Sequence, residues 1–144
     1  KTEIFSSFIM KNKQKLRKSV NGIINFTKKN NIKLALSTST TINNVEAVFK
    51  SLSNQISKED FHFIGNRSLV KYEKPNPEIY KLTLEKLNLE PDNCLAIEDT
   101  EESSKSAVSA GIKCIGFPGD YHSDDSFEMC IKKVKILDQS LFSL

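Results

Sequence analysis

The chain has 144 residues, of which 38% are hydrophobic and 27% charged, a composition typical of a soluble globular domain with one core. Its net charge of +3 is too small to indicate nucleic-acid binding, and no apolar stretch is long enough to span a membrane. Three cysteines form neither a CxxC pair nor a zinc-binding spacing, and no signal peptide is visible. We therefore expect a reducing compartment, either the cytoplasm or, in a photosynthetic eukaryote, the plastid stroma.

Apolar residues near the start of the chain recur at helical spacing. They predict one helix over residues 4–17 and a second over residues 20–30. The basic run Lys11–Lys18 has no interleaved aromatic residues, so we interpret it as a solvated helix face rather than an anion-binding patch. The sequence opens at Lys1, without a methionine and inside the first predicted helix, as a fragment or a processed chain would.

From residue 32 onward, short apolar runs alternate with amphipathic segments. This alternation predicts a parallel sheet flanked by helices, which is an α/β fold. Ligands of such sheets bind beyond the carboxyl ends of the strands. The predicted strands are 32–36, 61–65, 94–97, 113–117 and 134–137, and the predicted helices are 43–52, 79–89 and 103–110, the last one closed by Gly111.

A cluster of hydroxyl residues, Ser37 to Thr41, follows the strand predicted at 32–36. A threonine at a strand end can hydrogen-bond a phosphate oxygen, while the following backbone N–H groups supply further donors. The same cluster could equally provide the N-cap of the helix predicted from residue 43. The pattern alone leaves both interpretations open.

The segment Lys74-Pro75-Asn76-Pro77 cannot be helical, because each proline pushes the residue before it toward an extended conformation. A lysine stiffened by a following proline can hold its charge against a phosphoryl group and a carboxylate. The alternative is an exposed lysine just before a helix, which is the commoner case for a single lysine.

Two adjacent carboxylates, Glu98 and Asp99, end the apolar strand predicted at 94–97. Their mutual repulsion would be relieved by a hard cation, and Mg²⁺ in proteins is usually bound by one or two carboxylates and a phosphate. The alternative is that Asp99 or Thr100 caps the next helix while Glu98 lies in water.

Taken in order, these segments resemble three successive motifs of the haloacid dehalogenase superfamily, most closely its beta-phosphoglucomutase and CbbY-like branch. The resemblance runs from Lys1 to about Phe127 and implies a Rossmannoid parallel sheet. Residues 1–17 would be the remnant of a helical cap domain, and residues 18–144 an incomplete core domain. The matching segments are Lys1–Phe5, Leu34–Ser39, Glu73–Tyr80, Ala96–Thr100 and Ala107–Gly111.

The resemblance implies a Mg²⁺-dependent phosphohydrolase. Its substrate would be a sugar phosphate or a similar small phosphorylated metabolite, hydrolysed through an aspartyl-phosphate intermediate. Thr38 and the Ser39 N–H group would bind the transferring phosphoryl group, and Lys74 would neutralise its charge. Asp99 would ligate the metal, with Glu98 as a weaker ligand or a supporting group. Asn76 and Lys1 are further candidates for substrate binding.

The superfamily's first motif, Asp-x-Asp-x-Thr, is absent, because no two aspartates of this chain stand two positions apart. The resemblance therefore predicts that the first, central strand is missing between the strands that end near Thr38 and Glu98. We expect the chain alone to be inactive and unstable or aggregation-prone, and the complete protein to be a monomer. Serines also replace common glycines at two positions, Ser19 and Ser103.

Three alternatives remain at this stage. One is a phosphomutase of the same branch, and another is a non-catalytic remnant that binds a phosphorylated ligand or a partner chain. A third is a receiver-like module, which shares the strand-end threonine and lysine but gives no reason for Lys-Pro-x-Pro followed by Glu-Asp.

Overall fold

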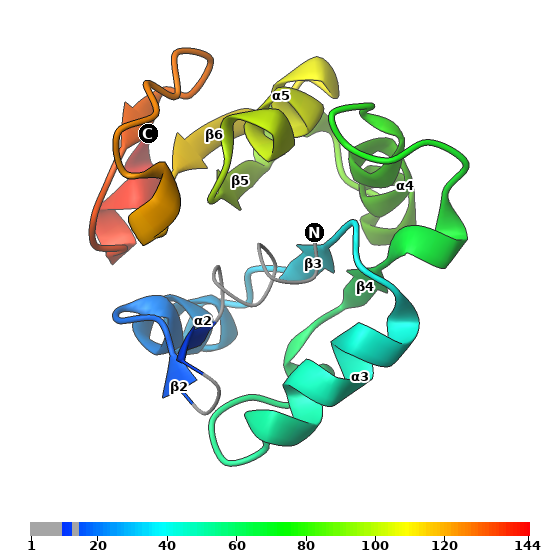
Figure 1. The fold of residues 1–144 in the computed structure, drawn as a ribbon, viewed down its shortest axis with the longest axis vertical. Helices are drawn as coiled ribbons and strands as arrows, with labels where there is room; N and C mark the ends of the chain where they lie inside the picture. The colour runs from blue at the N-terminus through cyan, green and yellow to red at the C-terminus, as the bar shows by residue number, and fades with distance from the viewer. Residues whose placement is uncertain (1–9, 13–14) are drawn as a thin grey trace.

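Residues 10–12 and 15–144 are described in the computed structural model, where strands and helices alternate as the sequence predicts (Figure 1). The strands are β1 (Met10–Asn12), β2 (Lys15–Leu16), β3 (Ala35–Ser37), β4 (Phe63–Gly65), β5 (Leu95–Glu98), β6 (Lys113–Gly116) and β7 (Lys132–Lys133). The helices are α2 (Val20–Lys29), α3 (Ile42–Ser51), α4 (Glu78–Leu87) and α5 (Glu101–Ser109), and short 3-10 turns lie between them.

Five of the strands are parallel and form two separate sheets. Strand β3 pairs with β4, while β5, β6 and β7 form a three-stranded sheet in that order. Parallel strands have to be joined by crossover connections, and helices provide them between β3 and β4 and between β5 and β6, whereas the link from β6 to β7 contains only a 3-10 turn. The predicted α/β class with parallel strands between helices is therefore confirmed.

Two layers of helices cover opposite faces of the strands. Because side chains alternate across a strand, one face carries Leu36 and Ile115, which join the core formed with α2 and α3. The other face carries Ala96 and Cys114, which belong to one buried cluster with Ile79 of α4 and Ala107 of α5. The strand ends between these layers then determine where polar side chains meet.

The two sheets do not join. Within the described residues, β3 has only β4 as a partner and β5 has only β6, so each keeps one unpaired edge. A cavity of about 760 Å³ is lined by Leu34, just before β3, and by apolar residues of both strands, including Leu36, Leu95 and Ile97. Of these four, only Leu36 is fully buried.

The prediction of one helix over residues 4–17 is wrong where it can be compared. Residues 10–12 and 15–16 form the antiparallel pair β1–β2. The prediction failed because the spacing of apolar residues over so short a segment cannot distinguish a helix from a twisted hairpin. Lys1 and the rest of residues 1–9 lie outside the described residues. The boundary between cap remnant and core at residue 17 stays a prediction.

The last predicted strand is also displaced. The strand expected at 134–137 is β7 at Lys132–Lys133, where two exposed lysines form the edge of the sheet. Exposed charged residues are common on edge strands because they discourage further pairing, and they carry no apolar signal for the prediction to use. Among the described residues, no helix has the length and apolar character needed to cross a membrane.

Candidate functional site

Three polar segments that are far apart in the sequence line the same cavity. Thr38 follows β3, Lys74 precedes α4, and Asp99 follows β5. All three side chains are buried, with exposed fractions of 3%, 6% and 4%. Because β3 and β5 both present their carboxyl ends here, the cavity lies where α/β sheets bind ligands.

Thr38 is held by its backbone at the end of β3. Its N–H donates to the carbonyl of Gly65 on β4 (3.1 Å), which continues the ladder one residue beyond the strand. Its hydroxyl oxygen accepts the backbone N–H of Thr40 (3.1 Å). A hydroxyl oxygen that accepts a hydrogen bond can still donate its own proton, so Thr38 can serve as a donor to an anion.

The N-cap of α3 is a different hydroxyl of the same cluster. Thr41 Oγ1 accepts the N–H of Asn44 (3.4 Å), whereas Thr38 Oγ1 accepts the N–H of Thr40, before the helix begins. The two interpretations that the sequence left open therefore belong to two residues. Thr41 caps the helix, and Thr38 faces the cavity.

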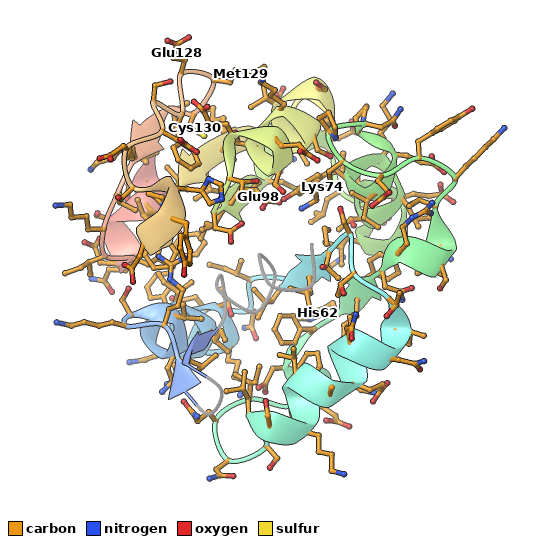
Figure 2. All side chains as sticks on the ribbon, viewed as in Figure 1. His62, Lys74, Glu98, Glu128, Met129 and Cys130 are labelled. Atoms are coloured by element: carbon orange, nitrogen blue, oxygen red, sulfur yellow. The ribbon has the colours of Figure 1, made fainter. Side chains whose placement is uncertain are left out.

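Lys74 and Glu98 form a buried ion pair. The Lys74 ammonium donates to Glu98 Oε1 (2.5 Å) and to the backbone carbonyl of Ser37 (2.9 Å). Figure 2 shows the two side chains close together near the middle of the view, while His62 lies apart from them. The alternatives of an exposed lysine and of a glutamate in water are both wrong. A buried ion pair of this kind requires both partners, because either one alone would leave an uncompensated charge.

The negative charge of Asp99 is less well compensated by neighbouring groups than that of Glu98. Burial and the neighbouring Glu98 carboxylate raise the pKa of Asp99 to about 7, although the charges of Lys74 and Arg17 act in the opposite direction. The helix that follows is capped by Thr100, whose Oγ1 accepts the N–H of Ser103 (3.1 Å). Asp99 is therefore not needed as the cap, and a cation beside it would relieve the strain of its buried charge.

The other predicted site residues are placed less centrally. Ser39 lines the cavity, whereas Asn76 is exposed and does not. Asn76 Oδ1 instead accepts the N–H of Glu78 (3.0 Å) at the start of α4. Lys1 lies outside the described residues, so its substrate-binding role stays a prediction, as does that of Asn76.

Two residues near the site had no role in the sequence-based prediction. Tyr80 of α4 donates its hydroxyl hydrogen to Glu98 Oε1. Arg17 is partly buried, with its guanidinium 3.7 Å from the ring of Phe117, and it donates to the carbonyls of Phe117 and Pro118 (both 2.8 Å). The prediction that Arg17 belongs to a solvated basic face is wrong, because its side chain is partly buried against Phe117 and Pro118. These partners lie about 100 residues away in the sequence, so the local pattern could not indicate them.

Ser19 and Gly111 have the left-handed backbone that favours glycine, with φ values of 74° and 85°. Ser19 therefore adopts a strained conformation at the position where the resembled family has a common glycine. Its hydroxyl accepts the N–H of Leu137 (2.8 Å), which ties the start of α2 to the C-terminal segment. This bond compensates for part of the strain.

The residues present fit a divalent cation in part. Asp99 offers a buried carboxylate with incomplete charge compensation, and Glu98 stands directly beside it. In the part of the chain that the structure describes, no group of three or more histidines, cysteines or acids could hold a metal ion. The described residues thus supply at most two acidic ligands here, and Mg²⁺ would need the rest from other oxygen donors, such as a phosphate or water.

Comparisons with known proteins show which family the chain resembles. A family model for haloacid dehalogenase-like hydrolases matches residues 2–111. The chain is 33% identical over 127 residues to protein CbbY of Cereibacter sphaeroides, a match that covers 88% of this chain and 55% of that protein. It is 36% identical over 116 residues to a phosphorylated carbohydrates phosphatase of Thermotoga maritima, covering 80% of this chain and 50% of the relative.

Solved structures agree with these matches. A crystal structure of a CbbY mutant from Rhodobacter sphaeroides, in complex with xylulose-(1,5)bisphosphate, aligns with a TM-score of 0.80 at 31% identity. The alignment covers 92% of this chain and 59% of that chain. The chain therefore spans about half the length of the curated relatives that it matches, and the predicted CbbY and beta-phosphoglucomutase-like branch is confirmed.

Proposed function

Because the chain belongs to the haloacid dehalogenase-like hydrolases, we propose that Thr38, Lys74 and Asp99 form part of a Mg²⁺-dependent phosphohydrolase site. The substrate would be a sugar phosphate or bisphosphate, or a similar small phosphorylated metabolite. The proposal is carried by one observation, which is that these three buried side chains line a single cavity at the ends of β3 and β5.

Thr38 and Lys74 would bind the phosphoryl group. The threonine hydroxyl can donate to one phosphoryl oxygen, and the Ser39 backbone N–H can donate to another. The Lys74 ammonium donates to Glu98 and to the Ser37 carbonyl. Its charge would be shared between Glu98 and the phosphoryl oxygens, which stabilises negative charge as the group is transferred.

Asp99 would hold the cation, and Glu98 would support it. When bound, Mg²⁺ neutralises charge on the phosphoryl oxygens and orients the group. The raised pKa of Asp99 supports this assignment, because a cation stabilises the ionised carboxylate that burial disfavours. Lys74 directly, and Asp99 through the cation that it holds, would therefore each place positive charge beside the same phosphoryl group.

The nucleophile would come from a strand that this chain does not contain. The resemblance assigns attack on phosphorus to an aspartate on that strand, which forms an aspartyl-phosphate. The unpaired edges of β3 and β5 support such a strand, since both border the apolar cavity. The half-length match to the relatives also supports a further segment. Inserted between β3 and β5, this strand would carry its carboxyl end to the site.

The names of the relatives favour sugar phosphates as substrates. One relative is a phosphorylated carbohydrates phosphatase, and one structural neighbour holds xylulose-(1,5)bisphosphate. We propose a phosphatase rather than a phosphomutase, although one relative is named beta-phosphoglucomutase.

The test begins with the coding sequence upstream of Lys1. We expect a segment with two aspartates two positions apart after an apolar run, and the protein that includes it is called the completed protein below. Purified completed protein should release inorganic phosphate from p-nitrophenyl phosphate, and from some members of a panel of sugar mono- and bisphosphates. Release should require Mg²⁺ and stop when the metal is chelated.

Lys74→Ala should lower kcat about a thousandfold, because it removes the charge that stabilises the phosphoryl oxygens. The matched control is Lys81→Ala, which removes an exposed lysine of α4 and should leave kcat unchanged. An upstream sequence without the aspartate pair, or a completed protein that releases no phosphate, would refute the proposal.

A further inference from the structure

A tyrosine completes the buried pair of Lys74 and Glu98. Tyr80 is 8% exposed, and its hydroxyl donates to the same carboxylate oxygen, Oε1, that accepts the Lys74 ammonium. The Lys74 Nζ atom also lies 5.1 Å from the centre of the Tyr80 ring. Tyr80 therefore contacts both partners of the pair, once through its hydroxyl and once through its ring.

The local sequence explains how Tyr80 reaches this position. After Lys74, the chain turns through Pro75 and Pro77 and enters α4 at Glu78. Tyr80 is in the first turn of that helix and belongs to the buried cluster that also contains Ala96 of β5 and Cys114 of β6. The same turn thus presents Lys74 and Tyr80 to Glu98 from two directions, and both side chains are buried there.

The Tyr80 hydroxyl is a hydrogen-bond donor and not an acid or a base. Burial and the nearby Glu98 carboxylate raise its pKa well above the usual 10, which favours the protonated hydroxyl. A neutral O–H group that donates to a buried carboxylate makes a strong hydrogen bond, because the acceptor is charged. It fixes the rotation of the carboxylate without changing the net charge of the site.

We propose that Tyr80 is a positioning residue, which holds Glu98 Oε1 against Lys74 so that the carboxylate keeps one rotation beside Asp99. Because both donors bind Oε1, the carboxylate would be held in one orientation, in which Glu98 can pair with Lys74 and also support the neighbouring cation site. Without the hydroxyl, the carboxylate would be held on one side only and would rotate more freely. This inference rests on the proposed function, because it assigns a task to Tyr80 in that same site.

The test is a double-mutant cycle in the completed protein, with p-nitrophenyl phosphate and Mg²⁺. Tyr80→Phe keeps the ring and removes only the hydroxyl. We expect kcat to fall about tenfold, the effect of losing one hydrogen bond to a charged group, with KM within about twofold of the wild type. In a Glu98→Gln background the same substitution should change kcat less than about twofold, because Tyr80 acts through Glu98.

Two control variants separate positioning from simple destabilisation. Thr83→Val removes another buried hydroxyl of α4, which bonds to Ser37 and Ile79 and not to Glu98, and should lower Tm without the tenfold loss of kcat. Tyr72→Phe makes the same chemical change at an exposed tyrosine and should have no effect. Equal losses of kcat from Tyr80→Phe in both backgrounds, or no loss in the wild type, would overturn the proposal.

A second readout does not depend on turnover. Mn²⁺ binding, followed by electron paramagnetic resonance, should weaken about threefold in Tyr80→Phe and should not weaken further when Glu98→Gln is already present. If the completed protein binds Mn²⁺ with this pattern but hydrolyses no phosphomonoester, the proposed function fails and the role of Tyr80 stands. If Tyr80→Phe binds Mn²⁺ as tightly as the wild type, or if no Mn²⁺ binds at all, the positioning role fails.

Discussion

The outer strand β6 and the inner strands β3 and β5 differ in how completely they are packed. On the outer side, β6 lies between β5 and β7, and its Cys114 and Ile115 are fully buried. On the inner side, β3 and β5 each lack one neighbour, and Leu95 and Ile97 are only partly buried. The contrast shows that the core around β6 is well packed, whereas β3 and β5, which carry site residues at their ends, each have an unpaired edge beside the cavity.

The largest test of this contrast is the stability of the chain by itself. Two unpaired edges and an apolar cavity at the centre of a sheet should be severely destabilising and prone to aggregation. We expect residues 1–144 alone to show no cooperative thermal transition as a monomer, and the completed protein to show one. A sharp, reversible transition of the monomeric 144-residue chain, followed by circular dichroism and light scattering, would contradict the contrast.

Hydrogen exchange measured peptide by peptide would sharpen the comparison strand by strand. In the isolated chain, amides of β6 should exchange more slowly than those of β3 and β5, because β6 has a partner on each side. In the completed protein, β3 and β5 should gain at least about tenfold protection, while β6 should change less. Equal gains in all three strands would show that the new strand stabilises the whole domain without entering the gap.

A smaller effect concerns how Asp99, the buried acid that follows β5, makes stability depend on pH. The pKa of Asp99 is raised to about 7, so the folded protein binds this proton more tightly than the unfolded chain does. The contribution of Asp99 to the free energy of unfolding should therefore fall as the pH rises from about 4 to about 7, and stay constant above that range.

The measurement is urea unfolding of the completed protein without Mg²⁺ at about pH 5 and about pH 8. Asp99→Asn should remove the fall and stabilise the protein at the higher pH by about 1–3 kcal/mol. Asp138→Asn is the control, because hydrogen bonds from Ser140 lower the pKa of that exposed acid, and this variant should give no such gain. If Asp99→Asn destabilises the protein at the higher pH, the carboxylate is compensated by a group outside the described residues.

Much of the fold could be predicted because its signals are local. Each central strand is a short apolar run that ends in a polar cluster, and each helix has apolar residues at regular spacing. The site could be predicted in outline for the same reason, since Thr38, Lys74 and Asp99 each follow or precede such a run. Their order along the chain, rather than any one of them, carried the resemblance to the family.

The features that the sequence could not predict depend mostly on contacts between residues far apart in the chain. Arg17 packs its guanidinium on the ring of Phe117, and the Tyr80 hydroxyl reaches its partner Glu98 only through the folding of the chain. The β1–β2 hairpin was missed because its few apolar residues fit helical spacing equally well. Asn76 was grouped with Lys74 by sequence proximity, yet the turn directs its side chain to the start of α4.

The account depends most on whether one phosphoryl group and one divalent cation meet Thr38, Lys74 and Asp99 together. The direct measurement is a crystal structure of the completed protein with Mn²⁺ and inorganic phosphate, in which anomalous scattering locates the metal. We expect the metal beside the Asp99 carboxylate and phosphate oxygens within hydrogen-bonding distance of the Thr38 hydroxyl and the Lys74 ammonium. A metal and a phosphate bound elsewhere, or at two separate places, would contradict it.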